Sequence, residues 1–320
     1  MSAKTILQIK NLDISFRTNA GVVHAIRGIN LDLQKGETVA IVGESGSGKS
    51  VTMKAAVGLL DSNATINSGE ILYTYDDGHG QDKTVDLLKL SKKQLRTEYN
   101  GQRLAMVFQD PMASLNPRKK VGDIISEGMD IHHRFANRQE REEKISEMLK
   151  KVGLSPEHAA RYPHQFSGGQ RQRVGITRAL IMNPKLIIAD ECISALDVSI
   201  QAQVVNLMKD IQAETQCAYL FIAHDLSMVK YISDRIGVLH LGYMVESGTK
   251  EEIFFHPLHP YTKSLLSAIP HPNPVVEKHR VALTYNYATS GIDYAKGTEH
   301  SVGGTHTVLA TDEEFDAWTK

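Results

Sequence analysis

The sequence predicts an α/β fold built around a strand, a glycine-rich loop and a helix. The strand is the apolar run 38–42, and the loop 43–50 reads Gly-Glu-Ser-Gly-Ser-Gly-Lys-Ser. A second apolar run, 186–190, ends in Asp190 and is followed by Glu191. Short buried strands separated by helical segments favour a sheet covered by helices. Ligands of such sheets bind at the carboxyl ends of the strands, so the loop and the two carboxylates are the first candidates for a site.

The loop 43–50 has the pattern of a phosphate-binding loop. Its backbone N–H groups and the start of the helix expected at 51–60 point at one spot, where they can hold a chain of phosphates. The glycines permit left-handed dihedrals and a close approach of the ligand. We expect Lys49 to reach the β- and γ-phosphates and the Ser50 hydroxyl to hold Mg²⁺. The alternative is a glycine-rich turn without a ligand, and the strand-to-helix placement argues against it.

Composition sets the class of protein. A length of 320 residues suggests about two domains, and 41% hydrophobic with 23% charged residues is typical of a soluble globular protein. The net charge of −1 gives no indication of a nucleic-acid ligand. Two isolated cysteines, Cys192 and Cys217, exclude a disulfide framework and suit a reducing cytosol. No apolar window is long enough for a membrane span or a signal peptide, so we expect any membrane role to be peripheral.

The first third of the chain predicts an antiparallel sheet beside this core. Residues 6–16 and 24–33 alternate apolar and polar side chains, and a further hairpin is expected from 69–75 and 84–88. Phe16 stands at the end of the first strand. An aromatic side chain there can stack on a nucleobase, and the alternative is a core or hairpin residue.

A helical insertion is expected from about 110 to 165. The strand 103–108 ends at Gln109, just before a proline, and apolar residues then follow helical spacing between 121 and 154. Charges of both signs alternate along 138–144. That alternation indicates a solvated helix face and not a nucleic-acid surface.

A second anion site is predicted at Ser167-Gly168-Gly169-Gln170, which precedes a helix expected at 172–182. Free N–H groups and the helix dipole favour an anion there, although a simple N-cap with flexible glycines is the alternative. The carboxylates after strand 186–190 favour the site: Asp190 can complete a Mg²⁺ shell, and Glu191 can orient and deprotonate an attacking water.

The buried run 219–223 ends at His224. A histidine at this edge of the sheet can contact a γ-phosphate, and the alternative is a structural histidine.

Taken together, these elements resemble the ATP-binding subunits of ABC transporters over about residues 5–250. The resemblance implies a P-loop NTPase core of ABC type, with a mixed sheet flanked by helices, an antiparallel β subdomain, a helical insertion and a C-terminal extension. It divides the chain into an ATPase domain, 1–250, and the extension, 251–320. It also implies that two subunits face each other head to tail, so that ATP lies between the phosphate loop of one and the Ser-Gly-Gly-Gln signature of the other.

The resemblance implies a role for each matching residue. Catalytic roles fall on Glu191 as general base, on His224 and Lys49 at the γ-phosphate, and on Gln109, which senses Mg²⁺ and the transmembrane partner. The Mg²⁺ ligands are Ser50, Gln109 and Asp190. The nucleotide-binding residues are Phe16 on adenine, Gly43, Glu44, Ser45, Gly46, Ser47, Gly48, Lys49, Ser50 and Val51 around the phosphates, and Ser167, Gly168, Gly169, Gln170 and Asp197 across the dimer interface.

Three stretches resemble a narrower group. The run 256–270, which contains His-Pro-Tyr, is similar to the C-terminal extension of oligopeptide and dipeptide transporter ATPases. The runs 109–118 and 195–206 are similar to the F-type subunit of that group, which pairs with a different, D-type ATPase. The implied function is ATP hydrolysis that drives oligopeptide import at the cytoplasmic face of the membrane. The implied partners are a second ATPase, two permease subunits and an extracytoplasmic peptide-binding protein, with no nucleic acid.

A non-transport ABC ATPase, such as a DNA-repair or translation factor, is the alternative. Such proteins carry tandem cores, zinc-binding cysteines or long coiled-coil arms, and this sequence has one core and two isolated cysteines.

Several positions depart from the family or have no assigned role. Cys192 follows the catalytic glutamate where the family has proline, and this leaves the positioning of Glu191 open. Phe166 replaces a common leucine, with no expected change in chemistry. No iron–sulfur centre is expected. Histidines at 256, 259 and 271 form either a proline-rich docking segment, which we favour, or a metal site. Residues 275–320 have no assigned mechanism and are expected to pack on the core.

Overall fold

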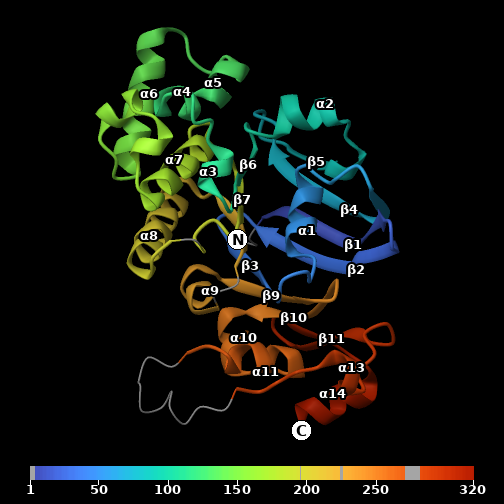
Figure 1. Cartoon of the computed structure of the whole chain (residues 1–320). Helices are drawn as coiled ribbons and strands as arrows, with labels where there is room; N and C mark the ends of the chain where they lie inside the picture. The colour runs from blue at the N-terminus through green and yellow to red at the C-terminus, as the bar shows by residue number, and fades with distance from the viewer. Residues whose placement is uncertain (1–3, 195, 224–225, 271–281) are drawn as a thin grey trace.

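Two β-sheets organise the part of the chain that the computed structural model describes, residues 4–194, 196–223, 226–270 and 282–320 (Figure 1). The first is an antiparallel sheet with strand order β2-β1-β4-β5. Its strands are β1 (Thr5–Thr18), β2 (Gly21–Gln34), β4 (Ala64–Asp76) and β5 (Asp82–Asp86).

The second sheet is central and mixed, with strand order β11-β12-β10-β9-β3-β8-β7-β6 in the described residues. Strands β9, β3, β8, β7 and β6 run parallel, while β10, β12 and β11 add to one edge in antiparallel pairs. The strands are β3 (Thr38–Val42), β6 (Leu104–Val107), β7 (Leu186–Asp190), β8 (Ala218–Ile222), β9 (Arg235–His240), β10 (Tyr243–Thr249), β11 (Thr298–Gly303) and β12 (His306–Ala310).

Helices cover this sheet and form the insertion, which projects from one end of the molecule in Figure 1, whereas the C-terminal extension lies at the other end. The helices are α1 (Lys49–Ala56), α2 (Lys92–Gln94), α3 (Pro111–Ser114), α4 (Val121–Ile125), α5 (Glu127–His132), α6 (Arg138–Lys151), α7 (Gly168–Leu180), α8 (Val198–Thr215), α9 (Leu226–Ile232), α10 (Lys250–Phe255), α11 (Pro260–Ser267), α13 (Tyr287–Ser290) and α14 (Asp312–Thr319). Shorter helical turns span Leu87–Lys89, Leu95–Tyr99, Pro156–Ala160 and Pro163–Gln165.

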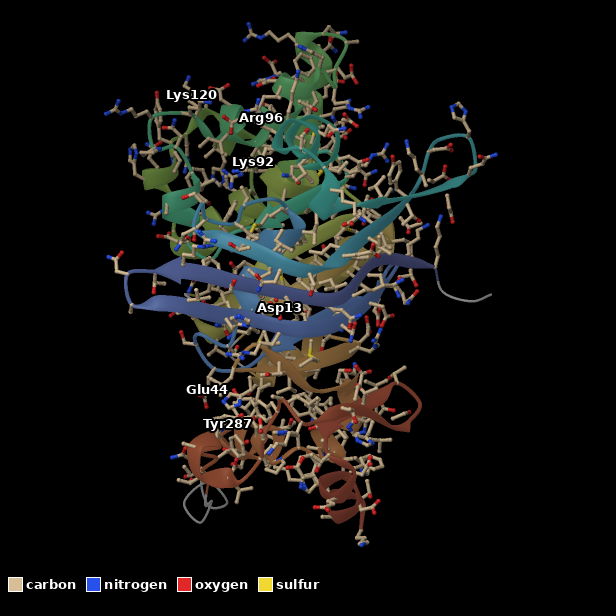
Figure 2. All side chains as sticks on the ribbon, turned by 90° about the vertical axis from the view of Figure 1, so that its right-hand side faces the viewer. Asp13, Glu44, Lys92, Arg96, Lys120 and Tyr287 are labelled. Atoms are coloured by element: carbon tan, nitrogen blue, oxygen red, sulfur yellow. The ribbon has the colours of Figure 1, made fainter. Side chains whose placement is uncertain are left out.

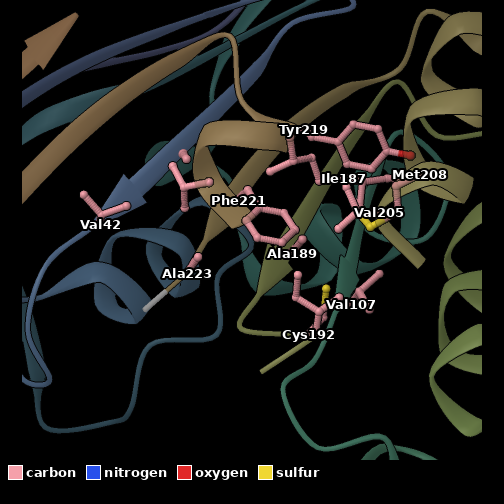
Figure 3. Packing of buried hydrophobic residues seen from close by; sticks show 14 of the residues in the cluster. Val42, Val107, Ile187, Ala189, Cys192, Val205, Met208, Tyr219, Phe221 and Ala223 are labelled. Carbon is pink, nitrogen blue, oxygen red and sulfur yellow. The ribbon is translucent and has the colours of Figure 1, made fainter. Parts of the chain in front are cut away.

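The central strands are buried on both faces, which is why they read as unbroken apolar runs in the sequence. In β3, Ala40 and Val42 pack on one face with α8, while Val39 and Ile41 pack on the other with α1 and the antiparallel sheet. Figure 3 shows the first of these clusters, in which Phe221 of β8 lies near Ala189 of β7. The sheet is therefore held from both sides, and its carboxyl ends are fixed in position.

The structure confirms the predicted fold class and adds one feature. The antiparallel sheet, the mixed sheet and the helices between β6 and β7 all lie where the sequence predicts them. The C-terminal residues do more than pack on the core, because β12 pairs with β10 and so extends the central sheet. The helix expected at 51–60 begins earlier and is shorter, at Lys49–Ala56.

Candidate functional site

The phosphate loop, residues 43–50, joins the end of β3 to the start of α1. Gly43 has φ +147°, and a Cβ atom there would lie 2.0 Å from the carbonyl oxygen of Leu239. Gly48 has φ +109° and caps α1. Any side chain at position 43 would collide with the end of β9, so the glycine is required by packing as well as by its dihedral angle.

The ammonium group of Lys49 lies inside this loop. Its Nζ donates hydrogen bonds to the carbonyl oxygens of Gly43, at 2.7 Å, and Glu44, at 2.8 Å. Burial lowers the pKa of Lys49, and the carboxylates of Glu191, Asp190 and Glu44 oppose that shift. A buried cation ringed by loop carbonyls and nearby carboxylates is placed to exchange those contacts for phosphate oxygens.

Ser50 and Asp190 bring the loop and strand β7 together. The Ser50 Oγ lies 3.1 Å from Oδ1 of Asp190, across 140 residues of sequence. A hydroxyl and a carboxylate are the hard oxygen donors that Mg²⁺ prefers. Gln109, just beyond β6, lines the same groove as Asp190. These three side chains carry oxygen donors of the kind that Mg²⁺ binds, and their role as its ligands stays a prediction.

Glu191 follows β7 and is held through its backbone. Its N–H donates to the carbonyl oxygen of Ile222 at 3.2 Å, and its carbonyl oxygen accepts from the Ser194 hydroxyl at 2.8 Å. With φ +46°, the residue is in the left-handed region, which is uncommon for a residue with a side chain. Cys192 beside it is buried in the core, and burial raises the pKa of its thiol to about 12. The Cys192 thiol therefore fills space in the core and is not a reactive group.

The signature, residues 167–170, forms the start of α7 and caps it. The Ser167 hydroxyl accepts from the Gln170 N–H at 3.3 Å, and Oε1 of Gln170 accepts from the Ser167 N–H at 3.0 Å. Figure 1 shows α7 and α1 on opposite sides of strands β6 and β7. One chain therefore does not carry its signature on the same side of these strands as its own phosphate loop.

For Phe16, Asp197 and His224 the structure gives less evidence of a role in the site. Phe16 is half-buried in β1, pairs with Val23 and packs against the second core cluster. Asp197 precedes α8 and is exposed, and its neighbour Val198 is 78% exposed. His224 lies outside the described residues. The adenine contact of Phe16 and the roles of Asp197 and His224 stay predictions.

Sequence reasoning missed one contact with the loop. The Glu44 N–H donates to the Tyr261 hydroxyl at 2.9 Å, and Tyr261 lies in α11 of the extension, 217 residues away. The His-Pro-Tyr run was the available signal, but spacing alone could not show that it reaches the phosphate loop. Within the described residues there is no cluster of three or more His, Cys, Asp or Glu arranged to hold a metal ion. His259 caps α11 by accepting the Tyr261 N–H at 3.0 Å, whereas His271, which belongs to the same predicted group of histidines, lies outside the described residues.

Comparison with known families agrees with this geometry. The family model described as "ABC transporter" matches residues 26–194, more than half of the chain. The chain belongs to the ABC transporter family. A second family model, described as "Oligopeptide/dipeptide transporter, C-terminal region", matches residues 245–289 of this ABC protein.

Relatives in this family match nearly the whole chain. It is 50% identical over 315 residues to the oligopeptide transport ATP-binding protein OppF of Bacillus subtilis (strain 168), covering 98% of this chain and 99% of that relative. It is 48% identical over 318 residues to the dipeptide transport ATP-binding protein DppF of Lactococcus lactis subsp. cremoris (strain MG1363), covering 99% and 97%. The predicted resemblance to oligopeptide and dipeptide transporter ATPases is thereby confirmed.

Solved structures of the family share the fold. The ATP-binding cassette MJ0796, in a dimeric post-hydrolysis state bound to ADP and phosphate, superposes with a TM-score of 0.66 at 27% identity and covers 77% of this chain and 99% of its own. CbiO1 from Clostridium perfringens, part of the ABC transporter complex cbiONQ, gives a TM-score of 0.65 at 27% identity, covering 79% and 92%. The similarity extends over the cassette and supports the topology described above.

Proposed function

We propose that this chain binds and hydrolyses ATP to energise an ABC importer of oligopeptides. The observation that carries the proposal is the meeting of the phosphate loop with β7, where Ser50 and Asp190 lie 3.1 Å apart and Glu191 follows directly. The oligopeptide transport relatives and the matched C-terminal region support the peptide substrate class. Those relatives do not favour a non-transport ABC ATPase.

In this mechanism each residue acts from the position described. Lys49 leaves the carbonyl oxygens of Gly43 and Glu44 and binds the β- and γ-phosphates, while the loop N–H groups hold the phosphate chain. Ser50, Asp190 and Gln109 would hold Mg²⁺, which neutralises charge on the phosphate oxygens when bound. Glu191, the general base, orients a water and accepts its proton as that water attacks the γ-phosphate.

We propose that two ATPase subunits form the complete site, with a D-type chain as the second. The signature residues Ser167 and Gly168 are exposed, and so are Asp197 and Val198 at the start of α8. An exposed helix N-terminus and an exposed apolar side chain beside it suit a head-to-tail interface. ATP bound by one phosphate loop then receives further N–H donors from the partner's signature, so a lone subunit hydrolyses slowly.

The permease is proposed to dock in a groove between the core and the helical insertion. The groove has a volume of about 1160 Å³ and contains the exposed apolar side chains of Leu59, Phe108 and Ile131. Asp190 and Gln109 line the same groove. A short apolar segment of a permease loop seated there would touch the insertion and the Mg²⁺ site together, and so couple ATP-driven closure to transport.

We place the chain at the cytoplasmic face of the membrane as a peripheral subunit, with an ATPase domain at 1–250 and the extension at 251–320. Among the described residues, no helix combines the length and apolar character needed to span a bilayer. An extracytoplasmic peptide-binding protein would join through the permease.

A pull-down tests this function. The tagged chain is recovered from detergent-solubilised membranes, and its partners are identified by mass spectrometry. We expect two polytopic membrane proteins, a second ATPase and a peptide-binding protein. A Leu59→Asp variant, which charges the groove, should lose the membrane proteins but still bind ATP, whereas the exposed control Val22→Asp on the β1–β2 hairpin should keep both. Recovery of soluble repair or ribosomal proteins without a membrane partner would overturn the transport assignment.

A further inference from the structure

The phosphate loop is held by contacts with the core and with the C-terminal extension. The Gly242 N–H, in the turn between β9 and β10, donates to the Ser47 carbonyl oxygen at 3.0 Å, and Gly43 packs on the Leu239 carbonyl. Both of these come from the backbone of the core. The third is the bond from the Glu44 N–H to the Tyr261 hydroxyl, at 2.9 Å, and it comes from a side chain of the extension. Figure 2 shows Glu44 where the core meets the extension.

This third bond acts on the peptide unit that also contacts Lys49. The peptide group between Gly43 and Glu44 is planar, and in the trans form its N–H and C=O point in opposite directions. Its N–H is held by Tyr261, and its carbonyl oxygen accepts from Lys49 Nζ at 2.7 Å. Rotation of this one peptide plane would break both bonds. Tyr261 therefore fixes the carbonyl against which the phosphate-binding lysine rests.

Tyr261 is itself held firmly. Its side chain is 1% exposed, and its ring stacks on His240 with centroids 3.9 Å apart and planes at 23°. His240 Nδ1 lies 2.7 Å from the Tyr294 hydroxyl, which lies 3.0 Å from the Tyr285 hydroxyl. We call His240, Tyr261, Tyr285 and Tyr294 the aromatic cluster. A tyrosine packed in this way can locate a backbone N–H to within a fraction of an ångström.

The His-Pro-Tyr order has a physical reason in this arrangement. His259 caps α11, Pro260 starts the helix with a fixed φ, and Tyr261 follows with its ring toward the core. The segment is held by the buried carboxylate of Glu246, which accepts the N–H groups of Leu258, at 2.7 Å, and of His259, at 3.1 Å. Every step from β10 to the phosphate loop is thus a direct contact.

We propose that Tyr261 is a positioning residue for ATP binding, through which the C-terminal extension sets the geometry of the phosphate loop. In this role it acts on the loop through the Gly43–Glu44 peptide, whose N–H it accepts. The inference rests on the proposed ATP site at residues 43–50 and adds to it a role for the extension.

The test compares two tyrosines of the aromatic cluster. Tyr261→Phe removes the acceptor of the Glu44 N–H and keeps the ring, whereas Tyr285→Phe removes a hydroxyl that bonds Tyr294 and does not contact the loop. MgATP affinity is measured on the full-length chain, and KM and kcat on the assembled transporter. We expect Tyr261→Phe to raise the Kd and the KM about five- to tenfold, with kcat at saturating ATP changed less than about twofold. Tyr285→Phe should leave both constants within about twofold of the parent.

Unchanged ATP affinity in Tyr261→Phe, or an equal loss in Tyr285→Phe, would overturn the proposal. A measurement on the unmodified chain serves if the variant folds poorly: the Glu44 amide should be protected from hydrogen exchange without nucleotide, and rapid exchange there would also overturn it. A Lys49→Ala variant distinguishes failure of the proposed ATP site from failure of the proposed role of Tyr261. If Lys49→Ala binds ATP normally, the proposed ATP site is wrong; if it loses ATP while Tyr261→Phe does not, only this inference is wrong.

Discussion

Lys49 and His259 are both buried titratable side chains, and they lie on the two sides of the junction between the phosphate loop and the extension. Burial lowers the pKa of each. Around Lys49, carboxylates at 190, 191 and 44 oppose that shift. Around His259, the nearby His240 and Lys263 add to the shift, and its pKa falls to about 3.

The difference separates a binding site from a structural cluster. A cation kept among carboxylates and exchangeable carbonyl contacts is available to a ligand of opposite charge. A histidine kept neutral, with Nδ1 accepting the Tyr261 N–H and its ring edge-on to Trp318 at 5.2 Å, holds the start of α11. Burial of an ionisable group therefore favours ligand binding at Lys49 and structural packing at His259.

The largest expected effect concerns the binding site and tests Glu191 as the general base. Glu191→Gln keeps the shape of the side chain and removes the base, so ATP hydrolysis by the transporter should fall by about 10²- to 10⁴-fold. ATP binding and closure of the ATPase pair should persist. Steady-state hydrolysis and nucleotide binding measure the two properties, with the exposed Glu251→Gln as the control. Normal turnover in Glu191→Gln would remove this residue from the mechanism.

The second effect tests the structural side by pH. Burial lowers the pKa of His240 to about 4, and that of His259 to about 3, against about 6.5 in an unfolded chain. Above pH 6.5 both states are neutral, so the histidines contribute no pH dependence. Between pH 6.5 and about 4 the unfolded chain binds protons that the folded chain does not, so the free energy of unfolding falls as pH falls.

By pH 5 we expect the free energy of unfolding to fall by about 2 kcal/mol per histidine, measured by chemical denaturation at several pH values. His259→Asn keeps an N-cap acceptor but does not titrate, and should reduce the loss. His79→Ala, in the exposed loop between β4 and β5, is the control and should not. Equal stability at pH 7 and pH 5 in the parent chain would contradict the assignment of these two histidines as neutral packing groups.

The smallest expected effect tests whether Ser167 of the signature binds ATP or only caps a helix. Ser167 and Thr249 cap α7 and α10 with the same capping box, so alanine at either position should lower the free energy of unfolding by about 1 kcal/mol. If Ser167 also donates to ATP on the partner subunit, Ser167→Ala should lower the ATPase rate of the complex at least about tenfold. Thr249→Ala should not. Equal rates in the two variants would leave the signature serine as a cap and nothing more.

The sequence was most informative where a local pattern carries the chemistry. A strand, loop and helix between residues 38 and 60 predicted the phosphate loop, and an apolar run ending in Asp190 and followed by Glu191 predicted the facing strand. Their meeting at 3.1 Å through Ser50 follows from the parallel topology, because parallel strands share one carboxyl edge.

Contacts between segments far apart in the chain could not be predicted from the sequence. Nothing in its periodicity pairs Glu44 with Tyr261, or Glu246 with His306 at 2.8 Å. One signal was overlooked: Gly303 and Gly304 stand between two short stretches that contain threonine and valine, a pattern typical of a hairpin, and these stretches form β11 and β12. Even with that hairpin predicted, its partner strand could not be, since pairing with β10 depends on the tertiary fold.

The pairing of β12 with β10 has a practical consequence for shortened forms of this protein. Glu246 and Ser247 face Val308 and Thr307 across the ladder, so the sheet runs through the boundary proposed at residue 250. A chain cut there would keep the whole phosphate loop and yet leave one side of β10 as a bare edge, with its N–H and C=O groups open to strands of other molecules. Such a fragment would self-associate, and its poor solubility would be a property of the cut, not of the ATPase.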